Sequence, residues 1–150
     1  MMLGNLSWGV YALIASMSWG LVYVLEEKLL KTGLSPIALQ LFVGLVSLPL
    51  YVVLFFLAKD KKANIGMVYE DPGLLFPIAI AGTLIVIANL LILFAVKDKN
   101  ATLVSFLEIT YPIFTFIFAV WILGDTQLSI PTFVGACLIA CGTGIILLKG

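Results

Sequence analysis

The sequence predicts an all-α membrane protein with five transmembrane helices, and three observations support this fold class. The 150-residue chain is 63% apolar, only 11% charged, and has a mean hydropathy of +1.21. Of its eight basic and eight acidic residues, all but one lie outside five long apolar runs. A soluble domain of this size needs about a quarter of its residues charged to cover its surface. Lipid must therefore be the solvent for most of this surface.

The five apolar runs define the expected helices in order. A helix rises about 1.5 Å per residue and the hydrocarbon core is about 30 Å thick, so about 20 apolar residues cross the membrane once. The runs predict one domain over residues 1–150, with helices at approximately 6–25, 36–58, 74–96, 101–123 and 130–148. No run alternates polar and apolar residues, as a membrane β-strand would.

The breaks between the runs carry signals for helix ends. Gly33 is expected to end the first helical segment, and Ser35 followed by Pro36 predicts an N-cap with proline at the first helical position. The longest break runs from Lys59 to Pro72. Inside the second run, Pro49 predicts a kink because it has no backbone N–H to donate.

Composition excludes several classes of function. The chain has no His and no Arg, and its net charge is zero, so we expect no metal site, no cofactor and no nucleic-acid partner. Cys137 and Cys141 lie four residues apart in the last run and are expected to be free thiols packed between helices.

The distribution of lysines gives a weak signal for orientation. Five crossings place the two termini on opposite sides of the membrane. The N-terminal side holds Lys59, Lys61 and Lys62, and the other side holds Lys28, Lys31, Lys97, Lys99 and Lys149. The positive-inside rule then favours a cytoplasmic C-terminus. A bias this small is also typical of a protein that inserts in both orientations.

Glu108 is the only charged residue within a run, and a carboxylate in hydrocarbon is costly. It belongs to a stripe with spacings of three and four residues, made of Ser105, Glu108, Pro112 and Thr115, with Tyr111 beside it. Because Pro112 has no backbone N–H, the carbonyl of residue 108 loses its helical donor. The pattern predicts a kink where Glu108 binds a proton or a cation. Alternatively, Glu108 is neutral and only positions a neighbouring helix, or it snorkels towards the interface.

Other polar and aromatic residues within the runs are candidate partners for the solute. Gln40 and Asn89 are the costliest of these to place in lipid, so we expect them to face the interior. Trp19 lies deep in the first run, where it can line a cavity.

Small residues define two expected packing faces. The first run repeats them every four positions, at Ala12, Ser16 and Gly20. The last run carries Gly135, Gly142 and Gly144, for a contact with another helix or another subunit.

Several short motifs follow one another at characteristic spacing. They are Ser18-Trp19-Gly20, Leu34-Ser35-Pro36, Tyr111-Pro112-Ile113-Phe114, Leu123-Gly124-Asp125 and Gly142-Thr143-Gly144. With these motifs the chain resembles one repeat of the drug/metabolite transporter superfamily, in the branch named for the EamA domain. Most members of that branch carry two such repeats with inverted topology, which enclose the substrate path between them. A single repeat is similar to the small multidrug resistance proteins, which work as antiparallel dimers.

The resemblance implies a half-size secondary transporter that is a multi-pass integral protein of the cell membrane. Its expected partners are the lipid bilayer, a small-molecule solute, and a second copy or a paired half-size homologue that completes an inverted dimer. One acid and no base within the runs favour a cationic or zwitterionic solute, moved by alternating access. The alternative is a non-transporting structural or assembly subunit. An enzyme is disfavoured because no nucleophile–base pair occurs within the runs.

Overall fold

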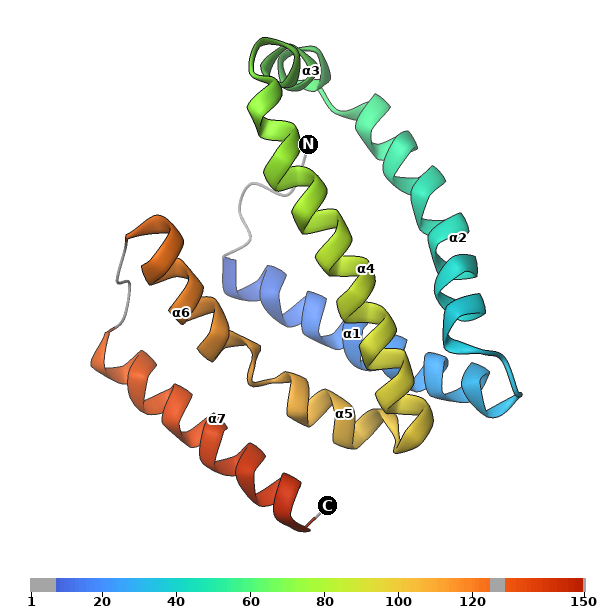
Figure 1. The fold of residues 1–150 in the computed structure, drawn as a ribbon, viewed down its shortest axis with the longest axis vertical. Helices are drawn as coiled ribbons and strands as arrows, with labels where there is room; N and C mark the ends of the chain where they lie inside the picture. The colour runs from blue at the N-terminus through green and yellow to red at the C-terminus, as the bar shows by residue number, and fades with distance from the viewer. Residues whose placement is uncertain (1–7, 125–128, 150) are drawn as a thin grey trace. The chain divides into compact units, whose positions relative to one another are not determined.

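The structure is a computed structural model that describes residues 8–124 and 129–149. Over these residues the chain forms helices and no strands, which confirms the predicted all-α class (Figure 1). The elements are α1 (Trp8–Lys31), α2 (Pro36–Leu57), α3 (Lys61–Glu70), the 3-10 helix η1 (Pro72–Leu74), α4 (Leu75–Asp98), α5 (Ala101–Glu108), α6 (Tyr111–Leu123) and α7 (Ile130–Lys149).

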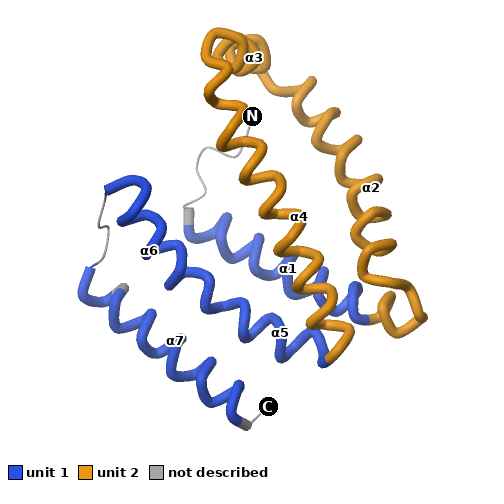
Figure 2. The backbone as a smooth tube through the Cα atoms, in the orientation of Figure 1, with its two compact units in different colours: residues 1–27, 99–150 blue, residues 28–98 orange. Residues whose placement is uncertain are grey.

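The chain divides into two compact units (Figure 2). Unit 1 comprises residues 1–27 and 99–150 and therefore contains most of α1 together with α5, α6 and α7. Within it, α5 packs against α7. Unit 2 comprises residues 28–98, in which α2 packs against α4 and η1 contacts both α3 and α4.

Four helical stretches of the described chain are long and apolar enough to cross a membrane. They are Gly9–Lys31, Pro36–Leu57, Pro72–Asp98 and Ala101–Leu123. A shorter apolar stretch, Phe133–Leu148, lies within α7. Most large hydrophobic side chains of these stretches are exposed, as expected where lipid is the solvent. The protein is therefore an integral membrane protein.

The first connection has the predicted helix-end signals. α1 continues past its apolar run to Lys31, and Gly33 then adopts the left-handed conformation with φ of +97°, which favours glycine. The Ser35 hydroxyl oxygen accepts a hydrogen bond from the Ala38 backbone N–H at 3.2 Å, with Pro36 in the first turn of α2. α2 then runs as one helix through Pro49 to Leu57.

The longest break of the sequence contains α3, and η1 begins at its last residue, Pro72. Both lie where α2 ends and α4 begins (Figure 1). The Lys61 ammonium donates a hydrogen bond to the Phe56 carbonyl near the end of α2. The Asp71 carboxylate accepts one from the Gly73 N–H at 3.0 Å and so caps η1. Hydrogen bonds from side chains to nearby backbone groups therefore stabilise the connection between α2 and α4.

Candidate functional site

The fourth apolar run is interrupted immediately after Glu108 (Figure 1). α5 ends at that residue, and the turn is closed by bonds from the Ile109 N–H to the Ser105 carbonyl (3.3 Å) and from the Thr110 N–H to the Leu107 carbonyl (3.2 Å). α6 restarts at Tyr111 with proline in its first turn. Proline cannot donate the hydrogen bond that would continue α5, so the run becomes two helices with Glu108 at their junction.

A cavity of about 520 Å³ lies at this junction, within unit 1. Its lining comprises Ser16, Trp19, Gly20 and Tyr23 of α1, with Ser105, Phe106, Glu108, Ile109 and Tyr111 of the interrupted span. The α1 residues recur at spacings of three and four, so they share one face of that helix. Ser105 and Glu108 are three apart and share a face of α5. The structure thus brings four predicted site residues together: Trp19, Ser105, Glu108 and Tyr111.

The two serine hydroxyls of the lining are held by their own helices. Ser16 donates to the Ala12 carbonyl at 3.0 Å, and Ser105 donates to the Thr102 carbonyl at 3.0 Å. A hydroxyl that donates its proton keeps two acceptor lone pairs. The serines can therefore accept hydrogen bonds from a solute, while the Glu108 carboxyl, which is half-buried, supplies the acidic group of the lining.

The aromatic part of the lining includes a residue that the sequence analysis missed. The ring centroids of Trp19 and Tyr23 lie 6.4 Å apart. Tyr23 is only 4% exposed, and its hydroxyl has no hydrogen-bond partner within the described chain. A signal existed, because Tyr23 follows Trp19 by four positions and Gly20 by three, and therefore continues the same face of α1.

Three predicted site residues lie elsewhere. Thr115 is in α6, outside the cavity lining, and its hydroxyl donates to the Tyr111 carbonyl at 3.1 Å. Gln40 in α2 and Asn89 in α4 belong to unit 2 and are half-buried there. None of these three side chains lines the cavity beside Glu108.

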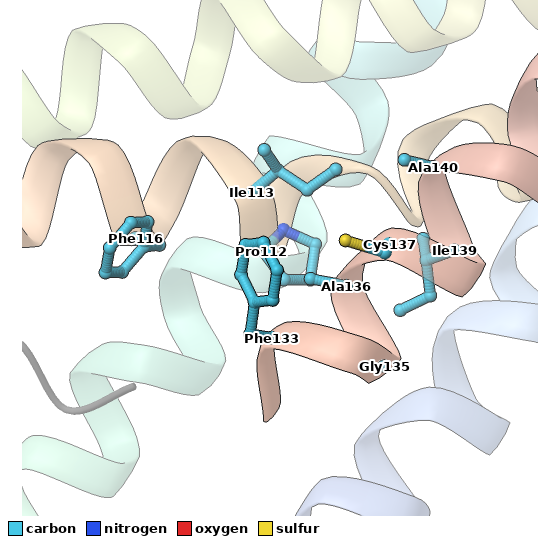
Figure 3. A pocket seen from close by; sticks show the side chains of 9 residues that line it. All are labelled: Pro112, Ile113, Phe116, Phe133, Gly135, Ala136, Cys137, Ile139 and Ala140. Atoms are coloured by element: carbon cyan, nitrogen blue, oxygen red, sulfur yellow. The ribbon is translucent and has the colours of Figure 1, made fainter. Parts of the chain in front are cut away.

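The small-residue faces have different surroundings. Ser16 and Gly20 line the Glu108 cavity, and Ala12 precedes Ser16 by one turn. In α7, Gly135 lines a second cavity of about 450 Å³ between α6 and α7 (Figure 3). A Cβ atom built at Gly135, Gly142 or Gly144 would meet no atom within 4 Å. These three glycines therefore have open space beside them, rather than a closely packed helix.

The second cavity has a hydrocarbon lining apart from the Cys137 sulfur. Its residues are Pro112, Ile113, Phe116, Phe133, Gly135, Ala136, Cys137, Ile139 and Ala140 (Figure 3). Cys137 and Cys141 are free, exposed thiols. In the described part of the chain, no cluster of three or more His, Cys, Asp or Glu side chains could hold a metal ion.

The family model of the EamA-like transporters matches residues 6–148. The chain belongs to the EamA-like transporter family. No curated protein and no solved structure matches it. The match covers nearly all of the 150 residues of this EamA-like chain.

Three of the sequence motifs of this EamA-like protein contribute to features described above. Gly124 ends α6 in the left-handed region, with φ of +66°. Asp125, which follows it in the motif, lies outside the described residues. Trp19 of the Ser18-Trp19-Gly20 motif and Tyr111 of the Tyr111-Pro112 motif both line the Glu108 cavity.

Proposed function

We propose that this EamA-like protein is a half-size secondary transporter that carries a small organic cation or zwitterion across the cell membrane. The single observation that carries the proposal is the cavity at the interrupted span, where Glu108 lies among aromatic and hydroxyl side chains of α1 and α5. Interrupted helices at a solute site recur in transporters, because the break supplies polar groups inside the membrane.

The chemistry of the lining favours an ammonium group in the solute. Glu108 is the only charged residue of the lining, and no lysine contributes to it. The exposed rings of Trp19 and Tyr111 provide faces that attract cations. Phe106 and Ile109 add apolar surface, which suits an organic body. A small amine with an apolar substituent matches all three features.

The same carboxyl can couple transport to protons. The Glu108 carboxylate carries a single negative charge. It can therefore bind a proton or the solute cation, but not both at once. Competition between the two for this carboxylate would exchange protons for solute across the membrane. Alternating access then requires the cavity to open to each side in turn.

We propose that a second polypeptide completes the transport path. Transporters built from two inverted repeats enclose the substrate path between the repeats, and this chain carries one repeat. The partner is a second copy in the opposite orientation or a paired half-size homologue. In α7, the exposed Gly142 has open space beside it, which leaves room for the close approach of a partner helix.

Uptake into proteoliposomes tests the proposal, with benzylammonium as the cation, glycine betaine as the zwitterion and benzoate as the anionic control. We expect saturable uptake of benzylammonium driven by a proton gradient, and none of benzoate. Glu108→Gln should abolish this uptake, whereas the control Glu70→Gln, at an exposed position in α3, should leave it unchanged. If neither benzylammonium nor betaine is taken up, the proposal is wrong and a structural or assembly subunit becomes the better account.

A further inference from the structure

One hydrogen bond connects α1 to the start of α5. The Ala101 backbone N–H donates to the Glu27 carboxylate, with 2.7 Å between the nitrogen and Oε2. The two residues are 74 positions apart, whereas the other side-chain hydrogen bonds described above join residues within five positions. Ala101 is the first residue of α5, and its N–H is one of the donors that a helix cannot satisfy internally.

The hydrogen bond between Glu27 and Ala101 is charge-assisted and shielded from solvent, so it should be stronger than a hydrogen bond between neutral, exposed groups. Ala101 is 2% exposed, and Glu27 is half-buried. A hydrogen bond from a backbone N–H to a carboxylate at a helix N-terminus is strengthened by the negative charge of the carboxylate and by its favourable interaction with the helix dipole. Asn100 caps the same end from within the chain, since its side-chain oxygen accepts from the Leu103 N–H at 2.9 Å. The first turn of α5 is thus capped by one local side chain and one from α1.

The bond lies on the same helix faces as the solute cavity. On α1, Glu27 follows Tyr23 by four positions and Gly20 by seven, so it shares a face with these lining residues. On α5, Ala101 precedes Ser105 by four positions and Glu108 by seven. Seven residues of helix span about 10 Å. The hydrogen bond is therefore at one end of α5, and the Glu108 carboxyl is about two turns away at the other end.

The interruption of the span makes this link important for the position of Glu108. α5 has only eight residues, and its helical hydrogen bonding does not continue into α6. The direction of α5 is therefore not set by a continuous helix through α6. A contact that fixes the first residue of α5 against α1 also sets where its last residue lies along the α1 face.

We propose that Glu27 is a positioning residue of the transport site. Its hydrogen bond to Ala101 sets the register of α5 against α1 and so places Glu108 opposite Trp19 and Tyr23. This inference rests on the proposed function, because it assigns to Glu27 the placement of the carboxyl that contacts the solute.

Hydrogen exchange of the full-length protein in lipid nanodiscs tests the link without any solute. Glu27→Ala leaves the Ala101 amide without this acceptor, and we expect exchange in the first turn of α5 to become about tenfold faster. Glu27→Gln keeps an oxygen acceptor and should restore most of the protection. The neighbouring carboxyl, Glu26, is on a different face of α1, so Glu26→Ala is the matched control and should change nothing there.

Benzylammonium uptake then tests the positioning role. We expect Glu27→Ala to raise KM about fivefold or more and to alter the pH profile of uptake, because the solute-binding carboxyl is displaced. Glu27→Gln should recover most of the affinity. In the double variant Glu27→Ala/Glu108→Gln, solute binding should be no weaker than with Glu108→Gln alone, since Glu27 acts through Glu108.

Each outcome decides between these roles. Unchanged exchange in Glu27→Ala would show that the hydrogen bond does not hold α5, and the inference would be wrong. If Glu27→Ala shows faster exchange but takes up benzylammonium with the wild-type KM and pH profile, Glu27 only caps α5. That result would overturn the inference but leave the proposed function standing. Wild-type uptake by Glu108→Gln would instead refute the proposed function, and the exchange data would still report on the link.

Discussion

The indole ring of Trp19 and the phenol ring of Tyr23 are inclined at 51° to each other, with their centroids 6.4 Å apart. The two residues are one helical turn apart on the α1 face that lines the Glu108 cavity. Trp19 is 52% exposed and Tyr23 is almost fully buried, so their roles should differ. Trp19 can reach a solute directly, whereas Tyr23 supports it from behind.

Replacement of Trp19 should weaken the binding of an organic cation. An indole face contributes about 0.5–2 kcal/mol to cation binding, which is about 2- to 30-fold in affinity. We therefore expect Trp19→Ala to raise the KM for benzylammonium within this range and Trp19→Phe to have a smaller effect. Trp121→Ala is the matched control, because Trp121 is 81% exposed on α6 and does not line the cavity. Equal effects of the two alanine variants would contradict a role of Trp19 in the site.

Removal of the Tyr23 hydroxyl should stabilise the solute-free protein against unfolding. This hydroxyl is buried and has no hydrogen-bond partner within the described residues, and an unsatisfied buried polar group costs about 1–3 kcal/mol. Tyr23→Phe deletes that group and keeps the ring, so the free energy of unfolding should rise by about 1 kcal/mol. Unfolding followed by circular dichroism in mixed micelles measures the change. Tyr51→Phe, at an exposed position in α2, should have no effect. A loss of stability in Tyr23→Phe would show that the hydroxyl has a partner.

The orientation in which the chain inserts into the membrane should change when a few lysines are added to one side. In the predicted five-helix topology, three lysines lie on the N-terminal side of the membrane and five on the other side, and lysines near the membrane favour the cytoplasmic side. Ala63→Lys together with Met67→Lys, both at exposed positions of α3, raises the first number to five. Reporter fusions after Gly150 should then show a larger fraction of chains with an extracytoplasmic C-terminus. The variant Ala63→Gln with Met67→Gln controls for the change in polarity. An unchanged, single orientation in both variants would argue against an inverted pair formed by two copies of this chain.

The fold class was predictable because the bilayer imposes a simple rule on the sequence. Charged residues are too costly in hydrocarbon, so the uncharged runs mark the membrane-spanning helices. Helix-end chemistry is equally local, which is why Ser35 and Gly33 were identified correctly as a cap and a helix end. α3 was missed because its ten residues carry no apolar run and no periodic pattern, and it is held by neighbouring helix ends.

The candidate site was predictable only in part, because its geometry depends on the helix break. The spacing of Ser105, Glu108 and Thr115 places them on one stripe if the helix is continuous. The turn between Glu108 and Tyr111 interrupts that helix and changes its phase, so Ser105 lines the cavity while Thr115 does not. The bond between Glu27 and Ala101 joins positions that no local pattern connects.

Glu108 should make transport dependent on pH. A carboxyl that exchanges a proton for the solute cation works only if it can release that proton on one side and regain it on the other. We expect the initial rate of benzylammonium uptake by the wild-type protein to vary between pH 5 and pH 9. Glu108→Gln cannot ionise, but it fills the same volume and still forms hydrogen bonds. This variant should therefore fold normally and lose proton-driven uptake at every pH. Glu108→Asp keeps the acid on a shorter side chain and should retain some activity with a displaced pH optimum. The thermal stability of each variant in the same lipid provides the control for folding. If Glu108→Gln transports benzylammonium at the wild-type rate across this pH range, Glu108 serves only as a structural hydrogen-bonding residue at the end of α5.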